Sequence, residues 1–182
     1  KTIVDVGANV GDTLVAMYAM NPKPFYIAIE PIPKYFYFLK ENVKFNKKID
    51  NKKIKLINVA ISDEHENITI ETLNGTAKQS QNGKIKIKAI PLNDLLKKDN
   101  IGLIKIDTDG FDWKVLRSSL KIIKQFKPAL FFEVQPNNNT IKEYIQEISK
   151  LIKLGYFIYV FDNYGNFIYT IKIIYTFLNH WR

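Results

Sequence analysis

The chain has 182 residues, of which 46% are hydrophobic, and this predicts one domain over residues 1–182 with a sizeable core. It has no cysteine, which excludes disulfides and thiolate metal sites, and no apolar run of the ~18 residues that span a membrane, so we expect a cytoplasmic protein with no membrane partner. The net charge of +9 comes almost entirely from lysines scattered from Lys23 to Lys172, a pattern typical of a solvated surface that argues against nucleic acid as a partner.

The first predicted strand begins at Thr2, where the chain opens directly on core residues, so we expect that upstream residues are missing. It turns through a glycine loop into a helix that continues to about Met20. Such a unit lets backbone N–H groups approach a bound nucleoside. Its glycine spacing does not match Gly-x-Gly-x-x-Gly, because position 9 is asparagine, which argues against a dinucleotide. The loop sequence is Asp5-Val6-Gly7-Ala8-Asn9-Val10-Gly11.

Two acids near this loop indicate the kind of nucleoside. Asp5, at the mouth of the loop, repels a pyrophosphate and attracts ammonium and sulfonium groups, which favours S-adenosylmethionine over NAD. This argument requires that Asp5 face the ligand and not the interior. Glu30 ends the second predicted strand, Phe25 to Ile29, where an acid accepts hydrogen bonds from ribose hydroxyls in either cofactor. An NAD-dependent oxidoreductase is therefore the disfavoured alternative.

The remaining pattern alternates between strands and helices, as expected for an open α/β sheet. In such sheets ligands bind beyond the carboxyl ends of the strands, so Ile61, Ser62 and Asp63 are expected to border an adenine ring. The predicted elements are a helix from Pro33, a strand at 53–61, a hairpin-like excursion at 67–73 and 84–90, a short helical turn at 91–96, a strand at 103–107, a helix at 113–124, a strand at 128–134, a helix at about 140–154 and a hairpin at 156–161 and 167–171, followed by an unassigned tail, 173–182.

Three carboxylates follow the strand at 103–107 within six residues. Asp107 ends the strand and is the acid that we expect to be functional, since charges at the mouth of a sheet are costly unless something uses them. Asp109 fits a turn, and Asp112 fits an N-cap or first-turn position of the next helix. The alternative is a divalent metal held by all three, because Mg²⁺ prefers oxygen ligands. Glu133 ends the next strand in the same way.

Together these motifs resemble, in order, the pattern of the FkbM-type methyltransferase family. The resemblance rests on the glycine loop, Glu30-Pro31, Val59-Ala60-Ile61-Ser62-Asp63, Lys105-Ile106-Asp107 with Gly110, then Glu133 and Gly155-Tyr156. It implies a class I, Rossmann-like α/β fold: a three-layer sandwich with a mostly parallel seven-stranded sheet and an antiparallel C-terminal hairpin.

The resemblance also implies S-adenosylmethionine as the cofactor and residues that hold it. Asp107 would lie next to the transferring methyl group. Carried over by position, the cofactor-binding residues are Asp5, Gly7, Ala8, Asn9 and Gly11 at the methionine end, Glu30 and Pro31 at the ribose, and Ile61, Ser62 and Asp63 at the adenine.

The expected reaction is O-methylation of a hydroxyl on a small molecule or sugar, which needs a group to take the proton of the acceptor. We predict Asp107 as base or orienter, with Asp109 and Glu133 lining the acceptor mouth, and no metal. His65 and His180 are weaker candidates for the base. A nucleic-acid methyltransferase and a non-catalytic nucleoside-binding module remain as alternatives, and the sequence predicts neither the acceptor nor the oligomeric state.

Overall fold

The computed structural model describes residues 1–73, 76–79, 83, 85–96, 99–134 and 141–171. These fall into two compact units, Lys1–Gln135 and Pro136–Arg182, which we describe separately. The tail that the sequence left unassigned lies outside the described residues. Among the helices that are described, none is both long enough and apolar enough to cross a membrane.

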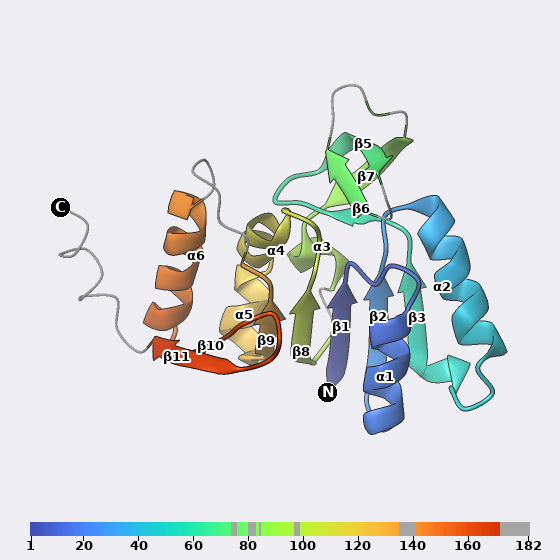
Figure 1. Ribbon diagram of the computed structural model, residues 1–182, viewed down its shortest axis with the longest axis horizontal. Helices are drawn as coiled ribbons and strands as arrows, with labels where there is room; N and C mark the ends of the chain where they lie inside the picture. The colour runs from blue at the N-terminus through green and yellow to red at the C-terminus, as the bar shows by residue number, and fades with distance from the viewer. Residues whose placement is uncertain (74–75, 80–82, 84, 97–98, 135–140, 172–182) are drawn as a thin grey trace. The chain divides into compact units, whose positions relative to one another are not determined.

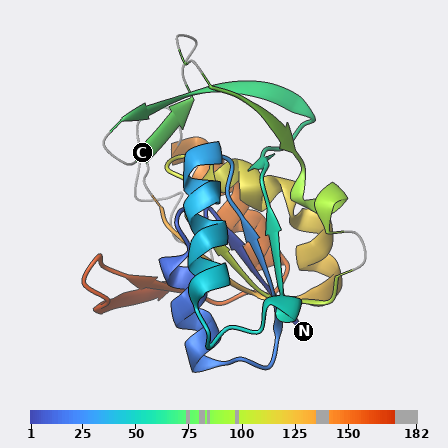
Figure 2. The ribbon, with the colours of Figure 1, turned by 90° about the vertical axis from the view of Figure 1, so that its right-hand side faces the viewer.

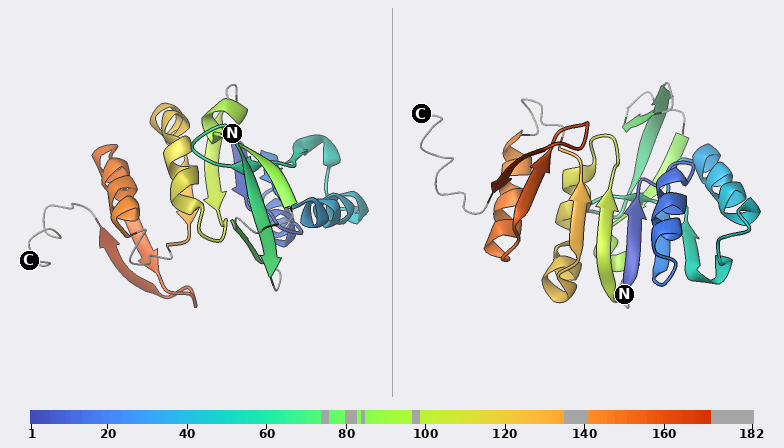
Figure 3. Two further views of the ribbon diagram at one scale, coloured as in Figure 1. Left: turned by 90° about the horizontal axis from the view of Figure 1, so that it is seen from above. Right: turned by 60° about the horizontal axis from the view of Figure 1, so that its bottom comes forward.

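The first unit is built on a parallel sheet of five strands, shown side by side in Figures 1 and 3. Its order is β3-β2-β1-β8-β9, so the chain runs outward from β1 in one direction and then crosses back to β8 on the other side. In open α/β sheets the crevice at such a reversal, beyond the carboxyl ends of the strands, is where ligands bind. The strands are β1 (Thr2–Val6), β2 (Phe25–Ile29), β3 (Ile54–Ile57), β8 (Ile101–Ile106) and β9 (Ala129–Phe132).

Helices cover both faces of this sheet, as Figure 2 shows with the sheet seen from its edge. On one face, α1 (Asp12–Met20) and α2 (Pro33–Phe45) pack against β2 in a core cluster that includes Leu14, Tyr26 and Leu39. On the other face lie α4 (Asp112–Ser118) and α5 (Leu120–Phe126). The sequence predicted α4 and α5 as one helix, but the helix is interrupted at Ser119, whose hydroxyl donates to the carbonyl of Leu116 at 2.8 Å.

A second, smaller sheet stands over the carboxyl ends of the main strands (Figures 1 and 2). Its order is β4-β7-β5-β6, and it contains the excursion that the sequence predicted. The predicted strand at 53–61 is in fact two strands, because the side-chain amide of Asn58 donates to the carbonyls of Glu30 (2.7 Å) and Pro31 (3.0 Å) and turns the chain out of the main sheet. The strands are β4 (Ala60–Ile61), β5 (Glu66–Leu73), β6 (Thr76–Gln79) and β7 (Ile85–Ile90). In the chain, the 3-10 turn η1 (Asn51–Lys53) directly precedes β3, and the helix α3 (Leu92–Leu95) follows β7.

The second unit contains α6 (Ile141–Lys153) and the hairpin of β10 (Ile158–Phe161) and β11 (Phe167–Ile171). Gly155 ends the helix, as predicted, with a left-handed φ of 87° and an N–H that donates to the carbonyl of Ile152. The hairpin is antiparallel, as predicted, but within the described residues its strands pair only with each other. The main sheet therefore has five strands and not the seven that the resemblance implied, because β10 and β11 form a two-stranded sheet of their own.

Candidate cofactor site

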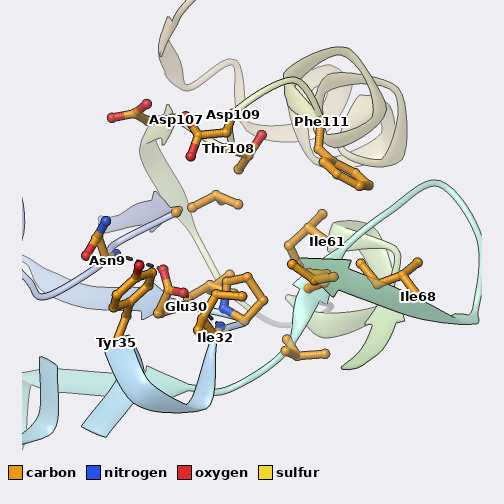
Figure 4. A pocket seen from close by; sticks show the side chains of 17 residues that line it. Asn9, Glu30, Ile32, Tyr35, Ile61, Ile68, Asp107, Thr108, Asp109 and Phe111 are labelled. Carbon is orange, nitrogen blue, oxygen red and sulfur yellow. Dashed lines mark hydrogen bonds between the residues drawn. The ribbon is translucent and has the colours of Figure 1, made fainter. Parts of the chain in front are cut away.

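A cavity lies at the carboxyl ends of β1, β2 and β8, beneath the second sheet (Figure 4). Its empty space, which includes open solvent at the mouth, is about 630 Å³. The residues that line it are Val6, Gly7, Asn9, Ile29, Glu30, Pro31, Ile32, Tyr35, Val59, Ala60, Ile61, Ile68, Ile70, Asp107, Thr108, Asp109 and Phe111.

The cavity is divided into a polar and an apolar part, which Figure 4 shows side by side. Polar side chains come from the loops that follow β1, β2 and β8. Apolar side chains come from the second sheet and from Phe111, which packs against that sheet's core cluster. The arrangement fits a ligand with a flat apolar group at one end and hydroxyl and charged groups at the other.

Glu30 is the most buried of the charged groups that line the cavity. It is 4% exposed, and its two carboxylate oxygens accept hydrogen bonds from the backbone N–H groups of Asn9 and Ile32, both at 2.8 Å. Burial raises the pKa of Glu30 above its ordinary 4.5, although these two hydrogen bonds favour the ionised form. Each oxygen keeps a lone pair, so the carboxylate can accept further hydrogen bonds from two neighbouring hydroxyls.

The glycine loop after β1 touches the exit of β8. Gly7 has a left-handed φ of 82°, and a Cβ at this position would lie 1.8 Å from the carbonyl oxygen of Asp107. Asn9 also has a left-handed backbone, with φ 48°, which directs its N–H to Glu30. Gly11, at the N-cap of α1, has φ 91° and leaves room for the side chain of Leu39. The loop is thus shaped by close backbone approach to the exit of β8, whereas the sequence argument predicted close approach to a bound nucleoside.

The loop after β8 carries two of the predicted carboxylates into the cavity wall. Asp107 is half-exposed, with a side chain 53% accessible, and its N–H donates to the carbonyl of Val6 at 3.0 Å. Asp109 lines the cavity with a left-handed φ of 50°, followed by Gly110 at 102°. Left-handed backbone at a non-glycine residue is strained and is concentrated at functional sites.

Asp112, the third carboxylate, has a structural role. It is buried, and its oxygens accept hydrogen bonds from the N–H groups of Thr108 (3.4 Å) and Gly110 (3.2 Å), which fixes the loop at the start of α4. Over the part of the chain that the structure describes, no three histidine, cysteine or acidic side chains are grouped so that they could hold a metal ion. The metal alternative therefore has no support from the geometry.

Asp5 does not face the cavity, which corrects the electrostatic argument from the sequence. It is 0% exposed, and its Oδ1 lies 3.0 Å from the ammonium of Lys105. Lys105 is the partner of Asp5 in the register of β1 and β8, so the two side chains leave the sheet on the same face. The charge of Asp5 is matched inside the protein, and its predicted contact with a cofactor has no direct support from the structure.

Several other predicted residues also lie outside the cavity lining. Ala8 is buried in the core cluster with α1 and α2. Ser62 is buried and donates to Glu66 at 2.5 Å, while Asp63 forms an ion pair with Arg117 at 2.5 Å. The others outside the lining are Gly11 and Glu133, and the weaker base candidate His65, which pairs with Asp94 on the surface; His180 lies outside the described residues.

The cavity also contains residues that the sequence reasoning missed. Tyr35 is in the first turn of α2, and Thr108 lies between two residues that were considered. Ile68 and Ile70 belong to β5, whose alternating pattern was visible but whose position above the main sheet was not. For Tyr35 and Thr108 the available signal was their closeness in the chain to Glu30 and Asp107.

A parallel sheet with helices on both faces, a glycine loop after the first strand and a buried acid after the second together define the class I, Rossmann-like methyltransferase fold. The family model described as the methyltransferase FkbM domain matches residues 5–158. The chain therefore belongs to the FkbM methyltransferase family.

Solved structures are similar in fold. The methyltransferase FkbM from Methylobacillus flagellatus KT is 16% identical with a TM-score of 0.64, over 82% of this chain and 37% of that one. This chain thus spans little more than a third of that relative. The precorrin-6y C5,15-methyltransferase from Geobacter metallireducens GS-15 is 11% identical (TM-score 0.49, 94% of this chain, 74% of that one), and the N-terminal domain of human METTL16 in complex with SAH is 15% identical (TM-score 0.48, 88% and 55%). A search of the curated proteins found no match.

Proposed function

We propose that the protein is an S-adenosylmethionine-dependent methyltransferase that methylates a hydroxyl of a small molecule or sugar. The observation that carries the nucleoside-binding part of the proposal is the Glu30 carboxylate, held by the N–H groups of Asn9 and Ile32 at the junction of the polar and apolar parts of the cavity. Membership of the FkbM family supports the methyl-transfer chemistry.

The residues of the cavity fit this donor. Glu30 is placed to accept hydrogen bonds from the two ribose hydroxyls, while Ile32 and Ile61 offer apolar contacts to an adenine ring. The polar wall near Asp107 and Gly7 would contact the methionine part of the donor. Thr108, between Asp107 and Asp109, also lines this part of the cavity.

The donor supplies a methyl group already activated by its sulfonium, so the protein must align the acceptor and remove its proton. Asp107 accepts the hydrogen bond of the acceptor hydroxyl and orients its oxygen. When the acceptor oxygen is methylated, Asp107 would take the proton that this oxygen loses. Asp109 lines the same wall and contacts the acceptor beside it.

The charge of the cavity supports a small, uncharged acceptor over a nucleic acid. The described residues that line it include Glu30, Asp107 and Asp109 but no lysine, arginine or histidine. A phosphate backbone would meet like charges there, although the chain as a whole carries a net charge of +9. Binding to RNA that falls steeply with salt would favour the nucleic-acid alternative.

The pH dependence of donor binding follows from Glu30. Its ionised form accepts the ribose hydrogen bonds, and burial raises its pKa above 4.5. We therefore expect affinity for S-adenosylmethionine to fall as the pH is lowered through a midpoint above 4.5, measured by calorimetry from alkaline pH downward.

The matched control for this prediction is Glu30→Gln, which keeps the shape of the side chain but not its charge. Loss of a charge-assisted acceptor should weaken binding about tenfold to a hundredfold at pH 7 and remove the acid-side decrease. A variant that keeps the same decrease with pH would show that the decrease does not come from Glu30.

The proposed function is tested in two steps. S-adenosylmethionine should raise the melting temperature of the protein, whereas NAD should not. Donor consumption is then measured with a panel of sugars and other hydroxylated compounds, using a donor with a deuterated methyl group, and the labelled product is identified by mass spectrometry. Binding of the donor with no labelled product from the panel or from a metabolite extract would favour the non-catalytic module.

A further inference from the structure

A lysine lies in the centre of the main sheet. Lys105, on β8, has a side chain only 8% exposed, and its ammonium lies 3.0 Å from Oδ1 of Asp5 and 3.3 Å from Oδ2 of Asp107. Asp107 follows two residues later, which by the period of a strand places it on the same face of the sheet. One buried ammonium therefore bridges a carboxylate in the interior and a carboxylate on the cavity wall.

Stability does not explain this arrangement well. Burying an ammonium costs several kcal/mol, and an apolar pair of similar volume is often equally stable or more so. In addition, Oδ2 of Asp5 is buried with no hydrogen-bond partner among the described residues, so the pair is not fully satisfied. The second partner of Lys105 is Asp107, which lies on the cavity wall, so the bridge can affect ligand binding there.

The consequence concerns the orientation of Asp107. Its Oδ2 is held by Lys105, while the hydrogen bonds of the described residues leave Oδ1 for a ligand. With 53% of its side chain exposed, Asp107 has no other restraint on the rotation of its carboxylate among the contacts of the described residues. Burial alone would lower the pKa of Lys105, but Asp5 and then Asp107 outweigh it and raise that pKa above 10.5, so Lys105 stays protonated at neutral pH.

We propose that Lys105 is a positioning residue that holds the carboxylate of Asp107 in one orientation at the cavity wall, beside the methyl group of the donor. This inference rests on the proposed function, because it needs Asp107 to face that part of the donor. Asp5 matches the charge of Lys105 on the interior side, and the contact of Lys105 with Asp107 does not depend on it.

The test compares two ligands that differ only at the methyl position. S-adenosylhomocysteine lacks the methyl group, and sinefungin has an amine-bearing carbon in place of the sulfonium and its methyl. An oriented Asp107 carboxylate should make the full chain bind sinefungin about tenfold more tightly than S-adenosylhomocysteine, as expected for a charge-assisted contact. Both affinities are measured by calorimetry on folded protein. A general loss of stability would weaken binding of both ligands equally and would leave their ratio unchanged.

The main variant keeps the net charge of the cluster constant. Asp5→Asn combined with Lys105→Met removes one negative and one positive charge and leaves no buried charge unpaired. We expect the ratio to fall from about ten to about one in this double variant, as in Asp107→Asn, and to stay near ten in Asp5→Asn alone, where Lys105 still holds Asp107. Lys105→Arg should keep most of the ratio.

A ratio that stays near ten in the double variant would show that Lys105 only neutralises Asp5 and would overturn the inference. Equal binding of the two ligands by the unmodified protein would overturn it as well, because Asp107 would then not lie beside the methyl position. Failure to bind either ligand would instead contradict the proposed function itself. If the double variant does not fold, Lys105→Gln replaces Lys105→Met, since glutamine keeps a polar side chain without the charge.

Discussion

Asp107→Asn should reduce the rate of methyl transfer about 10²- to 10⁴-fold, the contribution typical of a positioned acid or base. The asparagine keeps the size of the side chain and the backbone hydrogen bond to Val6, but it cannot take the proton of the acceptor. Affinity for S-adenosylhomocysteine should stay within about tenfold of the unmodified protein, because Glu30 and the glycine loop are untouched. The measurement is formation of labelled product with saturating donor and acceptor, next to calorimetry.

A matched control is Glu64→Gln, which removes an exposed carboxylate that does not line the cavity. Its rate should equal that of the unmodified protein. If Asp107→Asn transfers methyl groups as fast as this control, Asp107 is neither base nor orienter, and Asp109 becomes the next candidate on the same wall.

Gly7→Ala should abolish detectable donor binding. A Cβ at this position would lie 1.8 Å from the carbonyl oxygen of Asp107, so the glycine loop and the exit of β8 must move apart. The left-handed φ of 82° adds about 1–2 kcal/mol of strain for any residue with a Cβ. Because both loops line the cavity, we expect affinity for S-adenosylhomocysteine to fall more than about a hundredfold, which corresponds to about 2.7 kcal/mol.

Gly155→Ala separates the strain from the clash. Gly155 has a similar left-handed φ of 87°, but nothing lies within 4 Å of the Cβ that would be added. This variant should lose about 1–2 kcal/mol of stability from strain, which is a few degrees in melting temperature, and bind the donor normally. Similar losses of binding in both variants would mean that Gly7 matters through stability and not through the approach of the two loops.

The local features of the fold were predictable from the sequence because they depend on neighbouring residues. The turn from β1 into α1 follows from the spacing of Gly7 and Gly11, and the start of α2 follows from Pro33, which has no N–H to lose at a first helical position. The place of Glu30 in the cavity wall was predictable for the same reason, since it directly follows a buried strand.

What the sequence did not predict depends on which strands become neighbours. Lys105 and Asp5 are far apart in the chain and meet only because β8 pairs with β1, so the sequence argument assigned the charge of Asp5 to a ligand. In the sequence, Asn58 looks like an ordinary turn residue. Its role becomes visible only when its side-chain amide is seen to donate to two carbonyls that follow β2. That single turn creates the second sheet and with it the apolar wall of the cavity.

The assignment to a methyl donor now rests on different support from that of the sequence argument. The exposed, unmatched charge expected at Asp5 is absent, since Lys105 neutralises it inside the sheet. The assignment now depends on the family match over residues 5–158 and on the carboxylate of Glu30, which two backbone N–H groups orient. The acidic lining of the cavity still favours a cationic ligand over one that bears phosphates.

A crystal structure of the full chain with S-adenosylhomocysteine tests this account most directly. It should show both ribose hydroxyls within about 3.2 Å of the Glu30 carboxylate, the adenine ring against Ile61, and the sulfur nearer to Asp107 than to Phe111. A nucleoside bound elsewhere on the chain, or one that lies in this cavity without touching Glu30, would contradict it.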